Sequence, residues 1–483
     1  MASHISELNP KALWKNFESL TNIPRPSKKE EKVVEFVVNF AKAHGLKFIV
    51  DEVSNVIVSK PATKGYENRP GIVLQSHLDM VPQKNTATVH DFEKDPIQAV
   101  VDGEWVRAKG TTLGADNGIG VAAALAILES TDIPHGPVEA IFTIDEETGM
   151  AGAFNLKADA VKGRILMNLD SEDEGELYIG CAGGMNTTAT FTFKAEAVPA
   201  GSKAFKVNLT GLKGGHSGVD IHLGRGNANK LMNRLLWMAG RDLGLRISAL
   251  EGGNLRNAIP RESFATITIP ATQETAFLSW VAEFRAILKN ELSSVEPDIE
   301  LEAIPVSTPA TIMDKATQDK FLNAIYTMPN GAIRMLSDMP EIVETSTNLA
   351  IIKSDGTTIS IKCLLRSSVD SAKNDLGNAM TSVFELAGAT IIHEGSYPGW
   401  KPNVNSPILN TMKRIYYEKF GKIPDVKVIH AGLECGIIGD VYKGMDMISF
   451  GPTIRHPHSP DEKVNIATVE KFWTYLVETL KAI

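Results

Sequence analysis

Side chains that can bind metals follow short apolar runs at several separate places in this chain. They are histidines and carboxylates standing after strand-like segments or in the turn that follows: His77 and Asp79 after residues 72–74, Glu146 and Glu147 after 138–144, Asp170 after 165–169, and His458 after 447–450. Asp116 lies in the glycine-rich segment 110–118, which precedes a long apolar helix pattern. Alternating apolar runs and helical patterns predict parallel strands, and ligands bind at the carboxyl ends of such strands. We therefore expect these side chains to converge in a dinuclear metal site.

The surroundings of His77 and Asp116 indicate what each could do. Asp79 follows His77 at i+2, on the same side of an extended chain, where it can accept a hydrogen bond from the imidazole and fix its tautomer. The carboxylate of Asp116 could simply cap the helix expected at 119–128. Alternatively, its two oxygens could bridge two ions, since the glycines around it allow close approach of the backbone.

The remaining candidates differ in how strongly their surroundings favour a ligand role. Glu146 and Glu147 would repel each other unless positive charge lies beside them. Neighbours in an extended chain point to opposite sides, so one could ligate while the other faces a water molecule. Asp170 precedes an acidic stretch that is typical of a solvated loop. His458 lies in a turn bracketed by prolines, which would hold a ligand rigidly, and His456 is the alternative choice.

A donor set of this kind indicates a catalytic centre. Five donors with one shared give each of two ions three protein ligands, and structural zinc sites are closed by four. Histidine and carboxylate donors without thiolate favour zinc, with manganese or cobalt as alternatives. Such ions would lower the pKa of a water molecule whose proton a nearby glutamate could take.

Composition limits the class of protein. A chain of 483 residues is too long for one core, so two or more domains are expected. The net charge of −9 argues against a nucleic-acid binder, which needs a basic face. No signal peptide or membrane-spanning apolar stretch is recognisable. The three cysteines, Cys181, Cys363 and Cys435, form no Cys-x-x-Cys pair, so a reducing, cytoplasmic setting is expected.

The pattern of elements predicts a split α/β domain with an insert. Residues 1–186 and 397–483 alternate helical and strand-like segments, which predicts a catalytic domain with a mostly parallel central sheet. Residues 187–396 have the texture of an α+β insert, in two unequal sheet-and-helix halves joined near residue 300. Glycine-dense segments at 175–184 and 395–400 are the expected hinges.

Periodicity also predicts individual elements. Helices are expected at 10–20, 28–44, 119–129, 227–239, 275–292, 315–326, 372–387 and 408–419. Besides the apolar runs named above, strands are expected at 48–58, 187–194, 205–212, 255–269, 304–309, 342–353, 358–365 and 426–429.

Several of these segments carry a family resemblance. The stretches Ser76-His77-Leu78-Asp79, Gly114-Ala115-Asp116-Asn117-Gly118, Glu146-Glu147-Thr148-Gly149 and Pro457-His458-Ser459-Pro460 resemble the co-catalytic zinc peptidases of the aminoacylase, carboxypeptidase G and carnosinase family. The resemblance covers essentially the whole chain and implies a zinc-exopeptidase-like catalytic domain with a lid. Segments 83–85, 89–92, 212–218, 256–261 and 430–436 resemble those dipeptidases of the family that cleave Xaa-His dipeptides such as carnosine.

The resemblance also implies roles for particular residues. His77 and Asp170 would bind one zinc and Glu147 and His458 the other, and the Asp116 carboxylate would bridge them. A cis peptide bond between Asp116 and Asn117 is implied as well. Water held between the two zinc ions would attack the peptide carbonyl after losing its proton to Glu146, while Asp79 orients His77. In the lid, His216 matches an oxyanion-stabilising histidine. Asn257 and Arg366 match positions that bind substrate backbone and carboxylate, and Glu434 could hold a substrate amino group.

Some expectations remain open at this point. A homodimer is expected, but the lid of about 210 residues is roughly twice the usual size, so the subunit that supplies His216 is undecided. An N-acyl amino acid deacylase or carboxypeptidase of the same fold is the alternative function, distinguished by whether an acid such as Glu434 meets a free amino terminus. A non-catalytic metal-binding protein would be expected to have lost the base or a ligand, and this chain retains them all.

Overall fold

The computed structural model describes residues 4–483 and divides into two compact units. The first unit comprises the chain up to Gly180 with Trp400–Val428 and Leu433–Ile483, and the second comprises Cys181–Gly399 and Ile429–Gly432. Residues 181–186 and 397–399 therefore belong with the insert rather than with the outer segments. The short segment Ile429–Gly432 also belongs to the second unit, which the sequence did not indicate.

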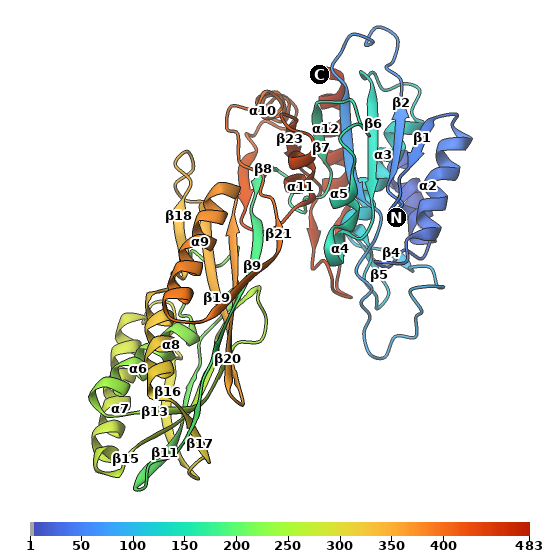
Figure 1. The fold of residues 1–483 in the computed structure, drawn as a ribbon. Helices are drawn as coiled ribbons and strands as arrows, with labels where there is room; N and C mark the ends of the chain where they lie inside the picture. The colour runs from blue at the N-terminus through green and yellow to red at the C-terminus, as the bar shows by residue number, and fades with distance from the viewer. Residues whose placement is uncertain (1–3) are drawn as a thin grey trace. The chain divides into compact units, whose positions relative to one another are not determined.

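The first unit is built on an eight-stranded sheet of order β1-β2-β6-β3-β7-β23-β8-β22 (Figure 1). Its strands are β1 (Lys47–Val50), β2 (Val56–Lys60), β3 (Ile72–His77), β6 (Val138–Thr143), β7 (Ile165–Asn168), β8 (Glu176–Cys181), β22 (Asp425–Ile429) and β23 (Asp446–Ser449). A four-stranded sheet consists of β24 (Ile454–Arg455), β25 (Lys463–Asn465), β5 (Trp105–Ala108) and β4 (Ala99–Asp102). The helices are η1 (Ile5–Glu7), α1 (Lys11–Thr21), α2 (Glu31–Ala43), α3 (Ala115–Glu129), α4 (Glu146–Gly149), α5 (Ala151–Asn155), α10 (Pro407–Phe420), α11 (Glu434–Val441) and α12 (Ile466–Ala482).

The centre of this sheet is parallel and its flanking strands are antiparallel. β3 pairs in parallel with β6 and β7, and β7 with β23, whereas β2 runs antiparallel to β6 and β8 to β23. Every residue of β3 is buried, as expected for a parallel strand covered on both faces. Helix α3 is apolar on all sides and almost entirely buried. The carboxyl ends of β3, β6 and β7 therefore deliver His77, Glu146 and Asp170 to one edge of the sheet.

The sequence interpretation of the first unit was wrong about one strand and incomplete about one helix. The run at 48–58 is a hairpin of β1 and β2, because the Asp51 carboxylate accepts hydrogen bonds from the backbone N–H of Val53 and Asn55 and reverses the chain. The sequence interpretation also omitted α12, a helix of 17 residues at the C-terminal end of the chain.

The second unit has one main sheet of order β16-β11-β15-β13-β19-β20-β9-β21, with β18 paired to β19. Its strands are β9 (Gly183–Thr192), β11 (Ser202–Thr210), β13 (Arg246–Gly252), β15 (Ser263–Pro270), β16 (Glu300–Val306), β18 (Gly331–Met335), β19 (Val343–Asp355), β20 (Thr358–Ser367) and β21 (Thr390–Tyr397). Shorter strands pair separately as β10 (Ala195–Ala197) with β17 (Thr311–Met313), and β12 (Gly215–His216) with β14 (Ala258–Ile259). The helices are α6 (Ala228–Asp242), η2 (Ala271–Gln273), α7 (Glu274–Glu291), α8 (Lys315–Thr327) and α9 (Asp370–Leu386).

The two halves expected in the insert share this sheet. They meet where β13 pairs with β19 over only two residue pairs, Glu251 with Lys353 and Gly252 with Ile352. The boundary is not a single point near residue 300, because β9, which opens the insert, lies among the strands of the later half. The expected strand at 255–269 is interrupted at Pro260, which lacks an N–H to donate, and becomes β14 and β15.

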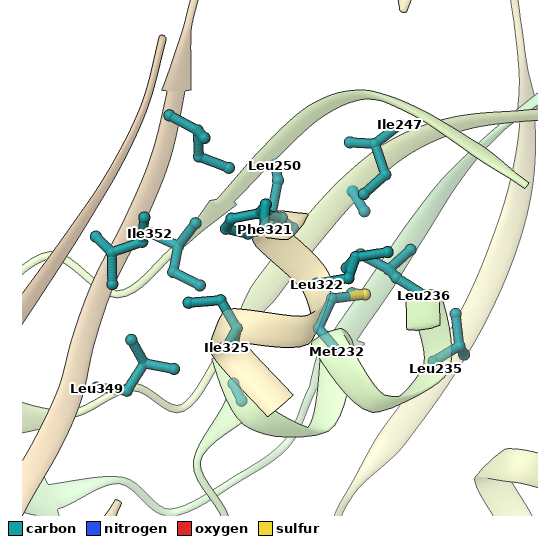
Figure 2. Packing of buried hydrophobic residues seen from close by; sticks show 14 of the residues in the cluster. Met232, Leu235, Leu236, Ile247, Leu250, Phe321, Leu322, Ile325, Leu349 and Ile352 are labelled. Atoms are coloured by element: carbon teal, nitrogen blue, oxygen red, sulfur yellow. The ribbon is translucent and has the colours of Figure 1, made fainter. Parts of the chain in front are cut away.

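One apolar core spans the join between the halves. Figure 2 shows side chains from two helices packed against two strands: Met232, Leu235 and Leu236 of α6, Phe321, Leu322 and Ile325 of α8, Ile247 and Leu250 of β13, and Leu349 and Ile352 of β19. Because the β13–β19 pairing is so short, this shared apolar packing also joins the two halves into one unit.

The segment 175–184 is mostly strand rather than a glycine loop. β8 and β9 occupy most of it, and its glycines serve close packing. A Cβ on Gly183 would lie 2.4 Å from the carbonyl oxygen of Tyr397, and one on Gly184 would lie 2.5 Å from the Tyr397 ring. The chain still passes from the first unit to the second at Gly180 and returns at Trp400. Helices of the described residues are all too short or too polar to cross a membrane.

Truncation of a leucine should show how far the second unit depends on its core. Leu322 of α8 is 2% exposed and Leu386 of α9 is 88% exposed, so Leu→Ala makes the same chemical change in two environments. We expect Leu322→Ala to lower the free energy of unfolding by about 2–5 kcal/mol and Leu386→Ala by less than about 0.5 kcal/mol. Urea unfolding followed by tryptophan fluorescence measures both, and equal effects would contradict the packing described.

Candidate metal centre

The carboxylate of Asp116 lies between two histidines. His77 Nε2 is 3.1 Å from Asp116 Oδ1, and His458 Nε2 is 3.2 Å from Asp116 Oδ2. No hydrogen bond from a backbone N–H of α3 to the Asp116 side chain is found among the described residues; its oxygens lie against the two histidines instead. The peptide bond from Asp116 to Asn117 is cis, which confirms the expectation from the resemblance. Each oxygen of this carboxylate thus faces a different histidine.

Two further carboxylates complete two groups of three ligands. Asp170 Oδ1 lies 3.3 Å from His77 Nε2, and Glu147 Oε2 lies 2.9 Å from His458 Nε2. Among residues 4–483, ligand atoms within 4.8 Å of one another include the groups His77, Asp116, Asp170 and Asp116, Glu147, His458. Asp116 is common to both groups, and His456 belongs to neither.

Asp79 connects the turn after β3 with the turn after β6. Its Oδ1 lies 3.3 Å from His77 Nδ1, on the side of the ring away from Asp116. The backbone N–H groups of Glu146 and Glu147 donate to the two Asp79 oxygens at 3.0 and 3.2 Å, and Ser27 Oγ donates at 2.8 Å. Asp79 therefore holds the backbone of the two glutamates while its Oδ1 faces the His77 ring nitrogen that points away from Asp116.

The donor set fits two divalent cations. Asp170 Oδ1 and Glu147 Oε1 are buried oxygens without a hydrogen-bond donor. Burial raises the pKa of Asp170 to about 7, and hydrogen bonds to Asp116 and Glu147 raise the pKa of His458 to about 11. Without cations, protons on Asp170 and His458 therefore offset the negative charge of these carboxylates. Divalent cations bound at the same positions would neutralise that charge instead.

Glu146 lies beside these groups, with a carboxylate oxygen within 4.8 Å of ligand atoms of His77 and Glu147, and is half-buried. Burial raises the pKa of its carboxyl well above the usual range, which suits a group that accepts a proton. Glu146 and Glu147 form the first turn of α4 after Asp145, whose φ is 55°. The prediction that they diverge because the chain is extended was therefore wrong; successive positions on a helix differ by about 100° in direction.

Glu434 is buried beneath this edge of the sheet. Its Oε2 accepts hydrogen bonds from Gln75 Nε2 at 2.6 Å and Thr143 Oγ1 at 2.8 Å, so residues on β3 and β6 hold it. The other oxygen, Oε1, is buried and has no donor. Burial raises the pKa of the Glu434 carboxyl to about 7. Glu434 therefore offers one oxygen to a cationic group.

The other three predicted residues are in the second unit. His216 of β12 pairs with Ala258 of β14, which brings Asn257 next to it in the ladder. Asn257 is exposed, and its carbonyl accepts a hydrogen bond from the Ser217 N–H at 2.8 Å. Arg366 on β20 is 5% exposed; Nη1 donates to Tyr397 Oη at 3.2 Å, and its buried Nε–H has no acceptor. Arg366 could thus bind an anion.

The tautomer of His216 is set by its own turn. His216 Nδ1 accepts hydrogen bonds from the backbone N–H groups of Gly218 and Val219, both at 3.1 Å. Burial and the positive charge of Arg366 lower the pKa of the His216 imidazole, so the ring is neutral at pH 7. A neutral ring that accepts at Nδ1 carries its proton at Nε2. His216 therefore presents an N–H donor.

Sequence reasoning missed four residues around these sites. In the first unit, Arg25 and Glu462 hold the backbone beside His77 and Asp116. In the second unit, Tyr397 contacts Arg366. His430, also in the second unit, has its Nε2 2.7 Å from Ser346 Oγ. Burial raises the pKa of the Glu462 carboxyl to about 7, and backbone N–H donors oppose that rise. His430 stands in a segment already singled out by its motif, and Glu462 lies two residues beyond the motif that contains His458. The only local signal for Arg25 is its place between two prolines.

Comparison with known proteins agrees with this geometry. The model of peptidase family M20/M25/M40 matches residues 73–482. The cytosol non-specific dipeptidase of Escherichia coli (strain K12) is 48% identical, over 100% of this chain and 99% of that protein. The crystal structure of an aminoacylhistidine dipeptidase from Vibrio alginolyticus has a TM-score of 0.97 and 49% identity, covering 100% of this chain and 98% of that one.

A more distant structure shares the fold. The aminopeptidase PepT from Bacillus cereus ATCC 10987 has a TM-score of 0.62 at 18% identity, covering 98% of this chain and 99% of that chain. The family match over most of the chain and the full-length relatives show that this protein is a peptide-bond hydrolase and belongs to peptidase family M20/M25/M40.

Proposed function

We propose that this peptidase is a dipeptidase that cleaves Xaa-His dipeptides, including the β-alanyl-histidine dipeptide carnosine, with two zinc ions per subunit. The observation that carries the proposal is the pair of ligand groups that share Asp116. Relatives similar over their full length are named as a non-specific dipeptidase and an aminoacylhistidine dipeptidase, and the first is named as cytosolic. A cytoplasmic location and a homodimer are part of the proposal.

In this proposal His77 and Asp170 hold one ion, Glu147 and His458 hold the other, and Asp116 bridges them. When bound, zinc would supply Lewis acidity, lowering the pKa of a water molecule and polarising the scissile carbonyl; manganese or cobalt could replace it. Asp79 keeps His77 in the tautomer whose Nε2 is free to ligate. Glu146 takes the proton from the attacking water and passes it to the leaving amine.

The second group of residues would recognise the substrate. Arg366 binds the C-terminal carboxylate through its free Nε–H, and Asn257 binds the substrate backbone. His216 donates from Nε2 to the oxyanion, whether it comes from the same subunit or from the other subunit of a dimer. In the first unit, Glu434 Oε1 accepts from the free amino terminus, which a deacylase would not require.

The two adjacent glutamates should separate base from ligand. Glu146→Gln keeps size and hydrogen bonding but removes basicity, so kcat should fall by about 10²- to 10⁴-fold while two zinc ions remain bound. Glu147→Gln is the matched control, and it should lose zinc because it removes a ligand. Activity assays with elemental analysis distinguish these results. Near-normal turnover of Glu146→Gln would show that another group is the base.

A panel of substrates tests the function itself. The zinc-loaded protein should hydrolyse carnosine and other Xaa-His dipeptides and should leave N-acetyl amino acids intact. Glu434→Gln should lower kcat/KM for free dipeptides by about 10- to 100-fold, the cost of a lost hydrogen bond to a charged group. Efficient hydrolysis of N-acetyl amino acids by the wild type would instead favour the deacylase, and cleavage of dipeptides lacking histidine at equal rates would remove the Xaa-His preference.

Replacement of His216 tests the proposed oxyanion donor. His216→Ala should lower kcat by about 10²- to 10³-fold with zinc content unchanged. His222→Ala is the matched control, since this exposed histidine lies six residues further along the same loop. Equal activities of the two variants would reduce His216 to a turn residue.

A further inference from the structure

Glu462 holds the backbone that leads into Asp116. Its carboxylate is 2% exposed and accepts hydrogen bonds from four consecutive backbone N–H groups. Leu113 and Gly114 donate to Oε2 at 2.7 and 2.9 Å, and Ala115 and Asp116 donate to Oε1 at 2.7 and 3.2 Å. One side chain therefore determines the path of the four residues that end at the shared carboxylate.

Arg25 holds carbonyl groups of the same region. Its guanidinium is 2% exposed; Nη1 donates to the carbonyl oxygens of Leu78 and Asp79 at 2.9 and 3.0 Å, and Nη2 donates to that of Gly114 at 2.5 Å. Arg25 thus connects the chain beside His77 and Asp79 with the chain beside Asp116. If either segment shifted, the hydrogen bonds through which Arg25 connects it to the other segment would be strained.

The glycines of the Asp116 segment make room for this guanidinium. A Cβ on Gly114 would lie 2.5 Å from Arg25 Nη2, and one on Gly118 would lie 2.6 Å from the same atom. The φ of Gly114 is 71°, a conformation that also favours glycine. The glycine spacing around Asp116 is therefore matched to a buried arginine as well as to the turn.

A purely structural role would not require charged groups here. The charge of Glu462 partly compensates that of Arg25, since it raises the pKa of the guanidinium that burial lowers. Even so, burying two charges costs more than burying apolar side chains of similar volume. Charged donors and acceptors do make stronger and more directional hydrogen bonds than neutral ones. The arrangement therefore favours positional accuracy at the ligands over stability.

We propose that Arg25 and Glu462 are positioning residues that hold the Asp116 carboxylate so that its two oxygens reach two metal ions at once. Both act through the backbone and touch neither ion nor substrate. The inference rests on the proposed dinuclear site. It concerns the geometry of the bridge, whereas the proposed function concerns which residues ligate and which substrate is cleaved.

Glutamine at position 462 gives a sharp test. Each Glu462 oxygen accepts hydrogen bonds from two backbone N–H groups. In Glu462→Gln the side-chain NH₂ replaces one of these oxygens, so in either orientation of the amide two backbone N–H groups face a donor instead of an acceptor. Glu139→Gln is the matched control at the opposite end of β6. There a single oxygen, Oε2, accepts both backbone N–H groups, from Lys162 and Gly163 at 2.8 Å, and the glutamine carbonyl can replace it.

The readout is the coupling between two metal ions in the manganese-loaded protein. A bridging carboxylate transmits magnetic exchange, so Mn²⁺ in the wild type and in Glu139→Gln should give the electron paramagnetic resonance spectrum of a coupled pair. Glu462→Gln should lose that spectrum, bind the second Mn²⁺ about 10- to 100-fold more weakly and lose kcat to a similar extent. Circular dichroism checks that the variant is folded, and Arg25→Lys, which keeps the charge but loses the fork of donors, should show the same change in smaller degree.

The outcomes separate the two proposals. A coupled spectrum and wild-type Mn²⁺ affinity in Glu462→Gln and Arg25→Lys would overturn the inference, even if both variants were less stable, and would leave the dinuclear function standing. A wild-type protein that bound one Mn²⁺ only would overturn the proposed dinuclear function and this inference with it. If Glu462→Gln does not fold, the spectrum and affinity of Arg25→Lys decide.

Discussion

The first unit is organised around an excess of negative charge on carboxylates that are largely withdrawn from water. Asp79, Asp116, Glu147 and Asp170 meet His77 and His458 at the carboxyl ends of parallel strands, with Glu146 beside them. Like charges so close together cannot all remain ionised without compensation. Some are satisfied by the protein, as Asp79 is by two backbone N–H groups and Ser27. The remainder, including buried oxygens of Asp170 and Glu147 without donors, require protons or metal ions.

The surrounding backbone is arranged to keep this charge in place. The hairpin loop between β24 and β25 carries both His458 and Glu462, and β25 pairs with β5, which precedes the glycine-rich segment of Asp116. One loop therefore supplies a candidate ligand and the carboxylate that holds the backbone of another. Arg25 likewise holds the backbone of the turn after β3, through the carbonyl groups of Leu78 and Asp79. Hydrogen bonds between backbone and buried charges thus set the geometry of the centre.

The candidate metal ligands and the proposed substrate-binding residues of the lid belong to different units. The first unit contains the candidate ligands, Glu146 and Glu434, and the second contains His216, Asn257 and Arg366. The motif at 430–436 is itself divided, since His430 belongs to the second unit and Glu434 to the first. Residues that look like one motif along the chain therefore belong to different units.

The sequence by itself determined the types of the candidate ligands and the elements that carry them, because apolar runs, strand ends and flanking glycines are local features of a chain. It predicted His77, Asp116, Glu147, Asp170 and His458 for this reason, and the structure brings them together. It did not predict Arg25 or Glu462, whose partners lie 53–89 and 346–349 residues away. Only the tertiary structure decided which oxygen meets which histidine, that β9 joins the later half of its sheet, and that Ile429–Gly432 belongs to the second unit. These are long-range contacts, and residue spacing does not encode them, since they depend on how distant segments pack in three dimensions.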